Sequence, residues 1–195
     1  MLCFITMKPV WLYPTDTIYA LGVSAFDPAA LALLAQIKGR PVTQSVSCLV
    51  RDVDDIARLA TINSTAQKLI TAFLPGALTI ILPATDARLQ HVSTDGTVSF
   101  RITPDNTAQQ TVVEFMDLYD APLTCTSANL HGQPPQSQPA AILHQLGEQA
   151  AHVTKVIDDG PRTGAASTVV RCVTDEVEII RVGAISEAEI LAVLK

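Results

Sequence analysis

Two basic residues at the end of an apolar segment have the types and spacing of a phosphate-binding group. The run AALALLAQI is followed by Lys38, Gly39, Arg40 and Pro41. Arginine offers a planar fork of donors and lysine a compact charge, the pair that proteins use to hold a triphosphate and to relieve charge at its reacting phosphorus. The negative end of a helix dipole would also stabilise both cations. Taken alone, the segment indicates either a phosphate clamp or a favourably charged helix end.

The segment TVSFR at 97–101 combines hydroxyls with a guanidinium. Side chains alternate along a strand, so residues 97, 99 and 101 share a face. Thr97 and Arg101 would then present a hydroxyl and a guanidinium to one cavity. An arginine on a buried face needs a partner. The carboxylate of a ligand would supply it, and so would an ion pair within the protein.

Three further segments bring small polar side chains to the ends of apolar runs. They are PTDTIY at 14–19, TCTSAN at 124–129 and GAASTVV at 164–170, the last with Arg181 on the next run. Hydroxyls and amides bind phosphates and sugars, and sites in α/β proteins form where strands end. Each segment is also compatible with a polar turn, or with a hairpin that carries an edge arginine. A site is expected only where the segments converge.

Several common catalytic patterns are absent from the sequence. It has no G-x-x-x-x-G-K-[ST] or G-x-G-x-x-G loop, no G-x-S-x-G elbow and no H-E-x-x-H helix. Its four cysteines form no C-x-x-C pair, and no histidines stand at metal-ligand spacing. We therefore expect no protein-held metal, and we interpret the cysteines as scattered reduced thiols of a cytoplasmic protein.

The elements that must position these groups alternate along the chain. Apolar and β-branched runs predict strands at 10–13, 46–50, 78–82, 97–102, 122–126, 154–157, 168–172 and 177–181. Helices are expected from Asp27-Pro28 to about Gly39, at 52–59, 64–73, 108–118 and 140–146, and from a capping box at Ser186 onward. Hairpin-like neighbours at 77–102 and 167–181 predict an α/β (α+β) fold with a mixed sheet flanked by helices.

The bulk composition fits one domain over residues 1–195. Hydrophobic residues make up 48% and charged residues 16% of the chain, which argues against disorder. The formal net charge of -6 argues against charge-driven wrapping of nucleic acid, although an acidic body can still carry a local basic pocket. Lys8 and Pro9 interrupt the apolar N-terminal run, so it resembles neither a signal peptide nor a membrane span. No membrane association is expected.

The order of these segments resembles the YrdC-like family of threonylcarbamoyl-AMP synthases. The matching runs are YPTDTIYALG, KGRP, FLPGALT, TVSFRI, PLTCTSANLHG, IDDGPRTGAASTVV and IIRVGA, which together extend from about Tyr13 to Ala184. The resemblance implies a twisted mixed sheet with helices on both sides and a positively lined cavity. It also implies an ATP-dependent nucleotidyltransferase that condenses L-threonine, bicarbonate and ATP to threonylcarbamoyl-adenylate and pyrophosphate. Partner proteins would then transfer the threonylcarbamoyl group to tRNA.

By this resemblance the candidate residues acquire roles. The residues implied for L-threonine are Thr17, Arg101, Cys125 and Ser167. The residues implied for ATP are Lys38, Arg40, Gln44, Thr97, Ser127, Asn129 and Arg181, with Lys38 and Arg40 as the catalytic pair and Mg²⁺ accompanying the nucleotide. Such a reaction needs positioning and charge stabilisation rather than a protein nucleophile, which agrees with the residue types present.

Some positions depart from the family pattern and keep other functions open. Ala20 stands where the family usually has glycine, Gln44-Ser45 replaces Asn-Pro, and His131 replaces a common serine. The run YALG is similar to that of a paralogous branch, the YciO-like proteins. The alternatives are thus a YciO-like protein with a different acyl or amino-acid substrate, and a non-catalytic module that binds RNA through the same basic cavity.

Overall fold

A single mixed sheet organises the molecule in the computed structural model, which describes residues 8–39 and 46–195. Within these residues nine strands are hydrogen-bonded in the order β7-β1-β2-β6-β3-β5-β4-β8-β9. Their bounds are β1 (Trp11–Tyr13), β2 (Ala20–Gly22), β3 (Ser47–Leu49), β4 (Leu78–Pro83), β5 (Thr97–Arg101), β6 (Leu123–Ser127), β7 (Lys155–Val156), β8 (Thr168–Arg171) and β9 (Glu178–Arg181). The order shows that strands far apart in the chain become neighbours.

The pairing of the strands is both parallel and antiparallel. β4 pairs antiparallel with β5 and parallel with β8, while β8 pairs antiparallel with β9. β3 pairs parallel with β5 and antiparallel with β6. These registers confirm the mixed sheet and both of the expected hairpin-like neighbours.

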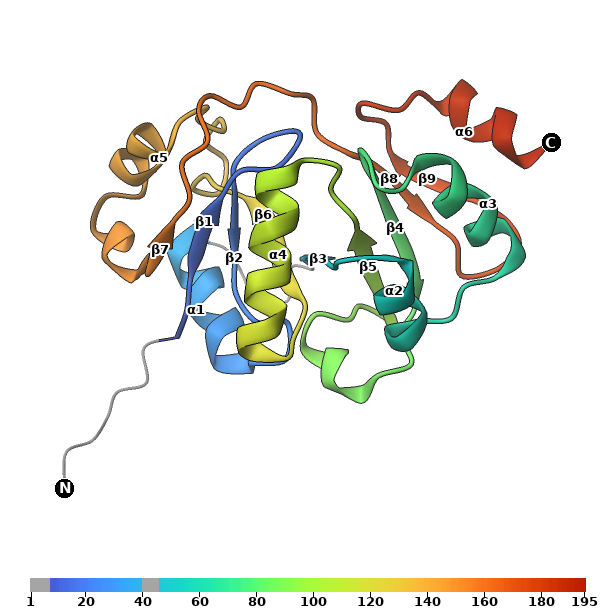
Figure 1. Cartoon of the computed structure of the whole chain (residues 1–195), viewed down its shortest axis with the longest axis horizontal. Coiled ribbons are helices and arrows are strands. Elements are labelled where there is room, and N and C mark those ends of the chain that lie inside the picture. Colours follow the sequence, from blue (N-terminus) through green and yellow to red (C-terminus); the bar gives the residue numbers. More distant parts are fainter. Residues whose placement is uncertain (1–7, 40–45) are drawn as a thin grey trace.

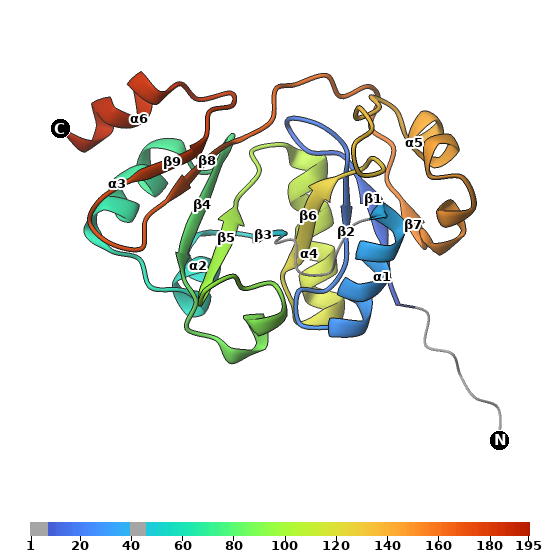
Figure 2. The same cartoon turned by 180° about the vertical axis from the view of Figure 1, so that it is seen from behind.

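Helices cover both faces of the sheet. They are α1 (Pro28–Lys38), α2 (Val53–Leu59), α3 (Ser64–Phe73), α4 (Asn106–Tyr119), α5 (Pro139–Leu146) and α6 (Glu187–Leu194), with short 3₁₀ turns at Ala87–His91 and Gly147–His152. Helix α4 lies in front of the sheet in Figure 1, and α1 lies in front in the reverse view of Figure 2. The expectation of helices on both sides is therefore confirmed.

Local sequence signals account for the ends of the helices. The Asp27 side chain accepts hydrogen bonds from the amides of Ala29 and Ala30 at the start of α1, and Gly39 ends this helix with φ 63°. A side chain with a Cβ is strained at such a φ, which explains a glycine at this position. Ser186 and Glu189 form the predicted capping box at the start of α6.

Two hydrophobic clusters fill the two sides of the sheet. The larger one contains Leu12, Leu34 and Phe100 and lies under α1. The smaller one packs Val112 and Phe115 of α4 against the opposite face. Because α4 packs on only part of that second face, other strands of the same face are left to form the floor of a cavity.

Candidate functional site

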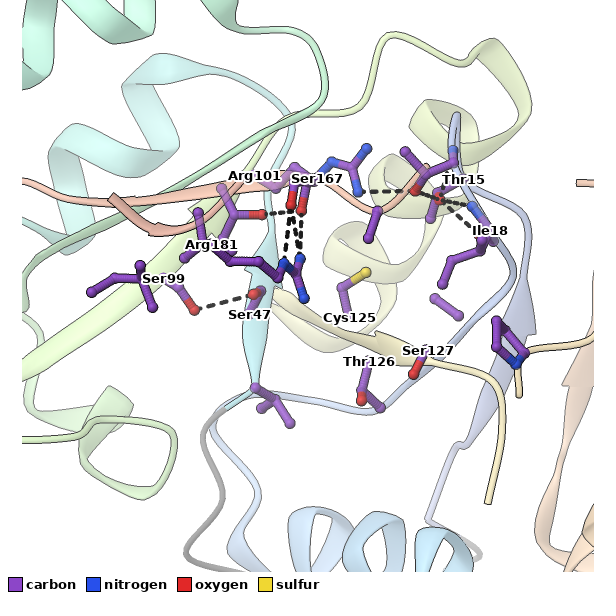
Figure 3. Close-up of a pocket in the computed structure, with 18 of the residues that line it drawn as sticks. Thr15, Ile18, Ser47, Ser99, Arg101, Cys125, Thr126, Ser127, Ser167 and Arg181 are labelled. Carbon is purple, nitrogen blue, oxygen red and sulfur yellow. Dashed lines mark hydrogen bonds between the residues drawn. The ribbon is translucent and has the colours of Figure 1, made fainter. Parts of the chain in front are cut away.

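A cavity of about 540 Å³ opens on the face of the sheet that also carries α4. Residues of β3, β4, β5, β6, β8 and β9 line it, together with segments near Thr15 and Ser167 (Figure 3). Segments that the sequence analysis considered one by one therefore meet in one hollow. At this volume the cavity falls in the range of small-molecule sites in proteins.

Strand register determines which side chains form the floor. Thr79 is paired with Val169, and Val169 with Arg181, across β4, β8 and β9. Ile80 is paired with Phe100, so Arg101 follows one residue later, beside Thr79. Paired residues point to the same face, and neighbouring strands lie about 4.8 Å apart. The two guanidinium-bearing residues thus stand in one row, three strands apart, with Thr79 and Val169 between them.

Arg101 is a fixed, buried cation, with 4% of its surface exposed. Both oxygens of Asp16 accept from its Nη2 at 2.7 Å, and the carbonyl of Gly76 accepts from Nε at 3.3 Å. Its Nη1 donates to Thr17 Oγ1 at 3.2 Å. The ion pair within the protein, which the sequence left as an alternative, therefore exists. It does not remove the guanidinium from the cavity, which Arg101 still lines.

The turn that follows β1 presents hydroxyls beside this guanidinium. Thr15 Oγ1 lies 2.9 Å from Thr17 Oγ1 and donates to the carbonyl of Ile18 at 2.6 Å. The amide of Gly164 donates to the carbonyl of Thr17 at 2.8 Å. A Cβ on Gly164 would meet the Thr17 carbonyl oxygen at 2.9 Å, so a glycine is needed for this close approach. The segment that leads to β8 is in this way docked onto the turn.

Lys38 brings a second cation to the other side of the cavity. Its Nζ donates to the carbonyls of Ser127 and Asn129, the latter at 2.8 Å, and lies 3.4 Å from Asn129 Oδ1. Ser127 Oγ donates to Asn129 Oδ1 at 2.5 Å. Ser127 and Asn129 both line the cavity, whereas Lys38 lies buried behind them. The ammonium thus holds the turn that ends β6.

The charges of Arg101 and Lys38 both act on the thiol of Cys125, which lines the cavity. Burial raises its pKa above the ordinary value, and the charges of Arg101 and Lys38 act in the opposite direction. The side chain therefore stays a neutral thiol at neutral pH, unsuited to nucleophilic attack.

A β-bulge directs Arg181 into the cavity. The register between β8 and β9 shifts so that Val169 pairs with Arg181 while Val170 pairs with Ile179, which leaves Ile180 as an extra residue. In a regular strand Arg181 would share the face of Ile179, which packs on the core. The bulge instead places Arg181 on the cavity side, where Nη2 and Nε donate to the carbonyl of Ser167 at 2.8 and 3.3 Å (Figure 3).

Not every predicted residue lies at the cavity. Thr17, Arg101, Cys125, Ser127, Asn129, Ser167 and Arg181 line it. Of the predicted residues that the structure describes, Thr97 and Lys38 do not line the cavity. Thr97 lies at the far end of β5, where its hydroxyl donates to the carbonyl of Thr94 at 2.8 Å, and Lys38 lies buried behind Ser127 and Asn129. Arg40 and Gln44 lie outside the described residues.

The sequence analysis also missed several polar groups of the floor. Ser99 Oγ donates to Ser47 Oγ at 3.1 Å, and Thr79 Oγ1 lies 2.8 Å from Ser167 Oγ. Figure 3 shows Ser47 and Ser99 pointing toward each other across the cavity floor. The available signal was a short hydroxyl side chain inside each of three β-branched or apolar runs. Alternation places only Ser99 on the face of Arg101, whereas strand pairing places Ser47 and Thr79 there.

Two kinds of feature are absent from the residues that the structure describes: a cluster of metal-binding side chains and a helix able to span a membrane. Over residues 8–39 and 46–195, no three histidine, cysteine, aspartate or glutamate side chains gather closely enough to bind a metal ion. Asp16 is engaged by Arg101 and by Thr103 Oγ1. The described residues therefore do not fit a metal held by the protein. In the same part of the chain, none of the helices has the length and apolar character needed to span a membrane.

Comparison with known proteins places these features in a family. A family model that joins Sua5, YciO and YrdC, and is described as "Telomere recombination", matches residues 4–183. The threonylcarbamoyl-AMP synthase of Bacillus subtilis (strain 168) is 32% identical over an alignment of 189 residues, which covers 93% of this chain and 52% of that protein.

Two solved structures share the fold. Pyrococcus abyssi Sua5 in complex with L-threonine superposes with a TM-score of 0.81 at 25% identity, over 96% of this chain and 54% of that one. Escherichia coli YciO superposes with a TM-score of 0.77 at 25% identity, over 93% of this chain and 86% of that one. The chain thus spans about half the length of the first two relatives and most of YciO. With a family match over nearly its whole length, the chain belongs to the Sua5–YciO–YrdC family.

Proposed function

We propose that the protein is an L-threonylcarbamoyladenylate synthase, which condenses L-threonine, bicarbonate and ATP to threonylcarbamoyl-AMP and pyrophosphate. The observation that carries the proposal is the row of Arg101, Thr79 and Arg181 on the floor of one cavity, with the ammonium of Lys38 behind the opposite wall. A ligand pair with a carboxylate at one end and phosphates at the other matches such a spread of cations.

The amino-acid end is assigned to the side of Arg101. Its guanidinium and the hydroxyl of Thr17 are 3.2 Å apart and border the same cavity, with Cys125 and Ser167 nearby. Asp16 orients the guanidinium from outside the cavity through Nη2, so the second N–H of Nη1 would donate to the carboxylate of L-threonine, beside the hydroxyl of Thr17. The comparison supports this end, because Pyrococcus abyssi Sua5 was solved with L-threonine.

The nucleotide end is assigned to Ser127, Asn129 and Arg181. Lys38 and Arg40 would act on the phosphates, and Gln44 would contact the nucleotide. Thr97 is omitted because its hydroxyl is used within its own hairpin. Magnesium would enter with the nucleotide substrate, bound by phosphate oxygens.

The chemistry asks the protein for placement and charge. The amine of L-threonine forms a bond to the carbon of bicarbonate, and water leaves, which yields a carbamate. A carbamate oxygen then attacks the α-phosphorus, and pyrophosphate departs with its electron pair. Lys38, Arg40 and Arg181 would stabilise the charge on the phosphates, while Arg101 and Thr17 hold the amino acid in line. The product would pass to proteins that transfer the threonylcarbamoyl group to tRNA.

A pyrophosphate-release assay tests the proposal. We expect release only when ATP, L-threonine and bicarbonate are all present, because the carbamate must form before the α-phosphorus is attacked. Omission and return of L-threonine is the decisive step, with D-threonine as the matched control. Release that is indifferent to L-threonine would refute the proposal.

A second candidate is a YciO-like activity on another amino or acyl substrate. The run YALG at 19–22, which is similar to that of the YciO-like branch, favours it, and the fold superposes on Escherichia coli YciO with a TM-score of 0.77. A thermal-shift screen of amino acids in the presence of ATP separates the two, because a ligand stabilises the state that it binds. A shift with another amino acid, and none with L-threonine, would favour this candidate.

A further inference from the structure

A pair of largely buried hydroxyls lies in the cavity floor between the two arginines. Thr79, on β4, has 4% of its surface exposed, and its Oγ1 is 2.8 Å from Ser167 Oγ. Thr79 belongs to the run FLPGALT, to which the proposed function assigns no role. A buried hydroxyl that only filled space would be replaceable by a methyl group, so its contact with a residue of the cavity needs an explanation.

Ser167 links this hydroxyl to Arg181. Its carbonyl accepts from Nη2 of Arg181 at 2.8 Å, and its Oγ lies 3.4 Å from the same nitrogen. The backbone around Ser167 is closely packed, because a Cβ on Gly183 would lie 2.6 Å from the Ser167 carbonyl oxygen. Thr79, Ser167 and Arg181 therefore form one continuous set of contacts along the floor.

The donors and acceptors of this set decide where the proton of Ser167 points. A hydroxyl has one proton and two lone pairs, whereas a guanidinium only donates. Arg181 therefore occupies one lone pair of Ser167 Oγ. If Thr79 donates to the other, both lone pairs are filled, and the serine proton must be directed elsewhere. The remaining direction is the cavity, which Ser167 lines.

We propose that Thr79 is a positioning residue of this site: it donates to Ser167 and so directs the hydroxyl proton of Ser167 toward an anionic oxygen of the ligand. The inference rests on the proposed function, in which that oxygen belongs to the carboxylate of L-threonine. In this role Thr79 acts on the ligand through Ser167. The same contact fixes the Ser167 backbone against which the guanidinium of Arg181 is held.

Substitutions of Thr79 separate this role from simple packing. Thr79→Val keeps the shape and the strand propensity but removes the hydroxyl, whereas Thr79→Ser keeps the hydroxyl. We expect Thr79→Val to weaken L-threonine binding about five- to tenfold, the usual effect of one hydrogen bond, and Thr79→Ser to restore it. Binding is measured by titration calorimetry with L-threonine alone, and folding by thermal melting. Thr79→Ala serves in place of Thr79→Val should the valine variant not fold.

A matched control comes from Thr111 on α4. It is equally buried, but its hydroxyl donates to the carbonyl of Thr107 within its own helix. We expect Thr111→Val to leave L-threonine binding unchanged, which shows that loss of a buried threonine hydroxyl is not in itself sufficient.

A double-mutant comparison with Ser167→Ala tests the route. If Thr79 acts through Ser167, then Thr79→Val causes no further loss of binding once Ser167 is alanine. Equal losses in both backgrounds, or wild-type affinity in Thr79→Val, overturn the inference while the proposed function stands. A wild-type protein that does not bind L-threonine is a different outcome, in which the proposed function and this inference fail together.

Discussion

Contacts with residues outside the cavity hold the Arg101 side chain in position. Asp16 accepts twice from Nη2, and the Asp16 carboxylate also accepts from Thr103 Oγ1 at 3.0 Å. Gly76 holds Nε through its carbonyl. A long side chain that is fixed on three sides loses little further entropy when a ligand binds. The planar fork is what allows one residue to serve the aspartate and the cavity together.

Replacement of Arg101 by lysine tests this reading. Lysine keeps the charge but cannot engage Asp16 with a fork and still reach the Thr17 hydroxyl, so we expect the KM for L-threonine to rise at least about tenfold. Steady-state pyrophosphate release measures it. Arg88→Lys is the control, because Arg88 pairs with Asp86 at an exposed position away from the cavity. A KM for Arg101→Lys within twofold of wild type would contradict the assignment.

The residues that the sequence pointed to differ in size and polarity from those that it did not. Charged and amide side chains such as Lys38 and Asn129 are unusual in apolar surroundings and attract notice. Thr79 and Ser47 are small, and inside β-branched or apolar runs they are hard to distinguish from ordinary strand residues. The convergence of the segments came from the order of family motifs, since local sequence does not contain the strand register that places Arg101 beside Thr79.

Among the elements, most boundaries followed from local signals. The helix 64–73 was predicted with the bounds of α3, and α1 begins and ends at its predicted caps. The strand β2 was not predicted, because its three residues directly follow a polar turn and are defined by pairing with β1 and β6 rather than by a pattern of their own. The bulge in β9 was missed for the same reason, since a bulge is a property of two paired strands.

Gly183 follows the bulged strand β9 and lies against the segment that carries Ser167. A Cβ at this position would lie 2.2 Å from the carbonyl oxygen of Ala166, so the segment that carries Ser167 would have to move. We expect Gly183→Ala to weaken L-threonine binding by more than about tenfold and to lower the free energy of unfolding by roughly 1–3 kcal/mol, typical of overpacking. Calorimetry and urea unfolding measure the two effects.

Gly96→Ala distinguishes loss of stability from loss of the site. Gly96 has φ 73°, and nothing lies within 4 Å of a Cβ placed there, so its replacement costs about 1 kcal/mol of backbone strain at a distant turn. We expect this variant to be less stable than wild type but to bind L-threonine normally. Parallel losses of binding in both glycine variants would show that general destabilisation, rather than the position of Ser167, explains the result for Gly183.

The molecule as a whole buries several groups that ionise only at alkaline pH. Burial raises the pKa of the Cys48 thiol to about 12 and that of the Cys172 thiol to about 11. The pKa of the fully buried Tyr13 is raised as well, chiefly by burial. In the unfolded chain these groups titrate near their ordinary values. The folded state therefore keeps protons that the unfolded state releases.

The sign of the resulting pH dependence is fixed by this difference. Stability from these groups is intact below about pH 9, where thiols are protonated in both states, and it falls as pH rises toward 12 because ionisation favours the unfolded chain. For Cys48 alone the fall is about 1.4 kcal/mol per pH unit in that window. Urea midpoints measured from pH 7 to 11 should stay level and then decline. Cys48→Ala, though less stable at pH 7, should decline less steeply, since one titrating group is gone. If the variant and the wild type lose stability in parallel above pH 9, the buried Cys48 thiol does not govern the alkaline limit of the fold.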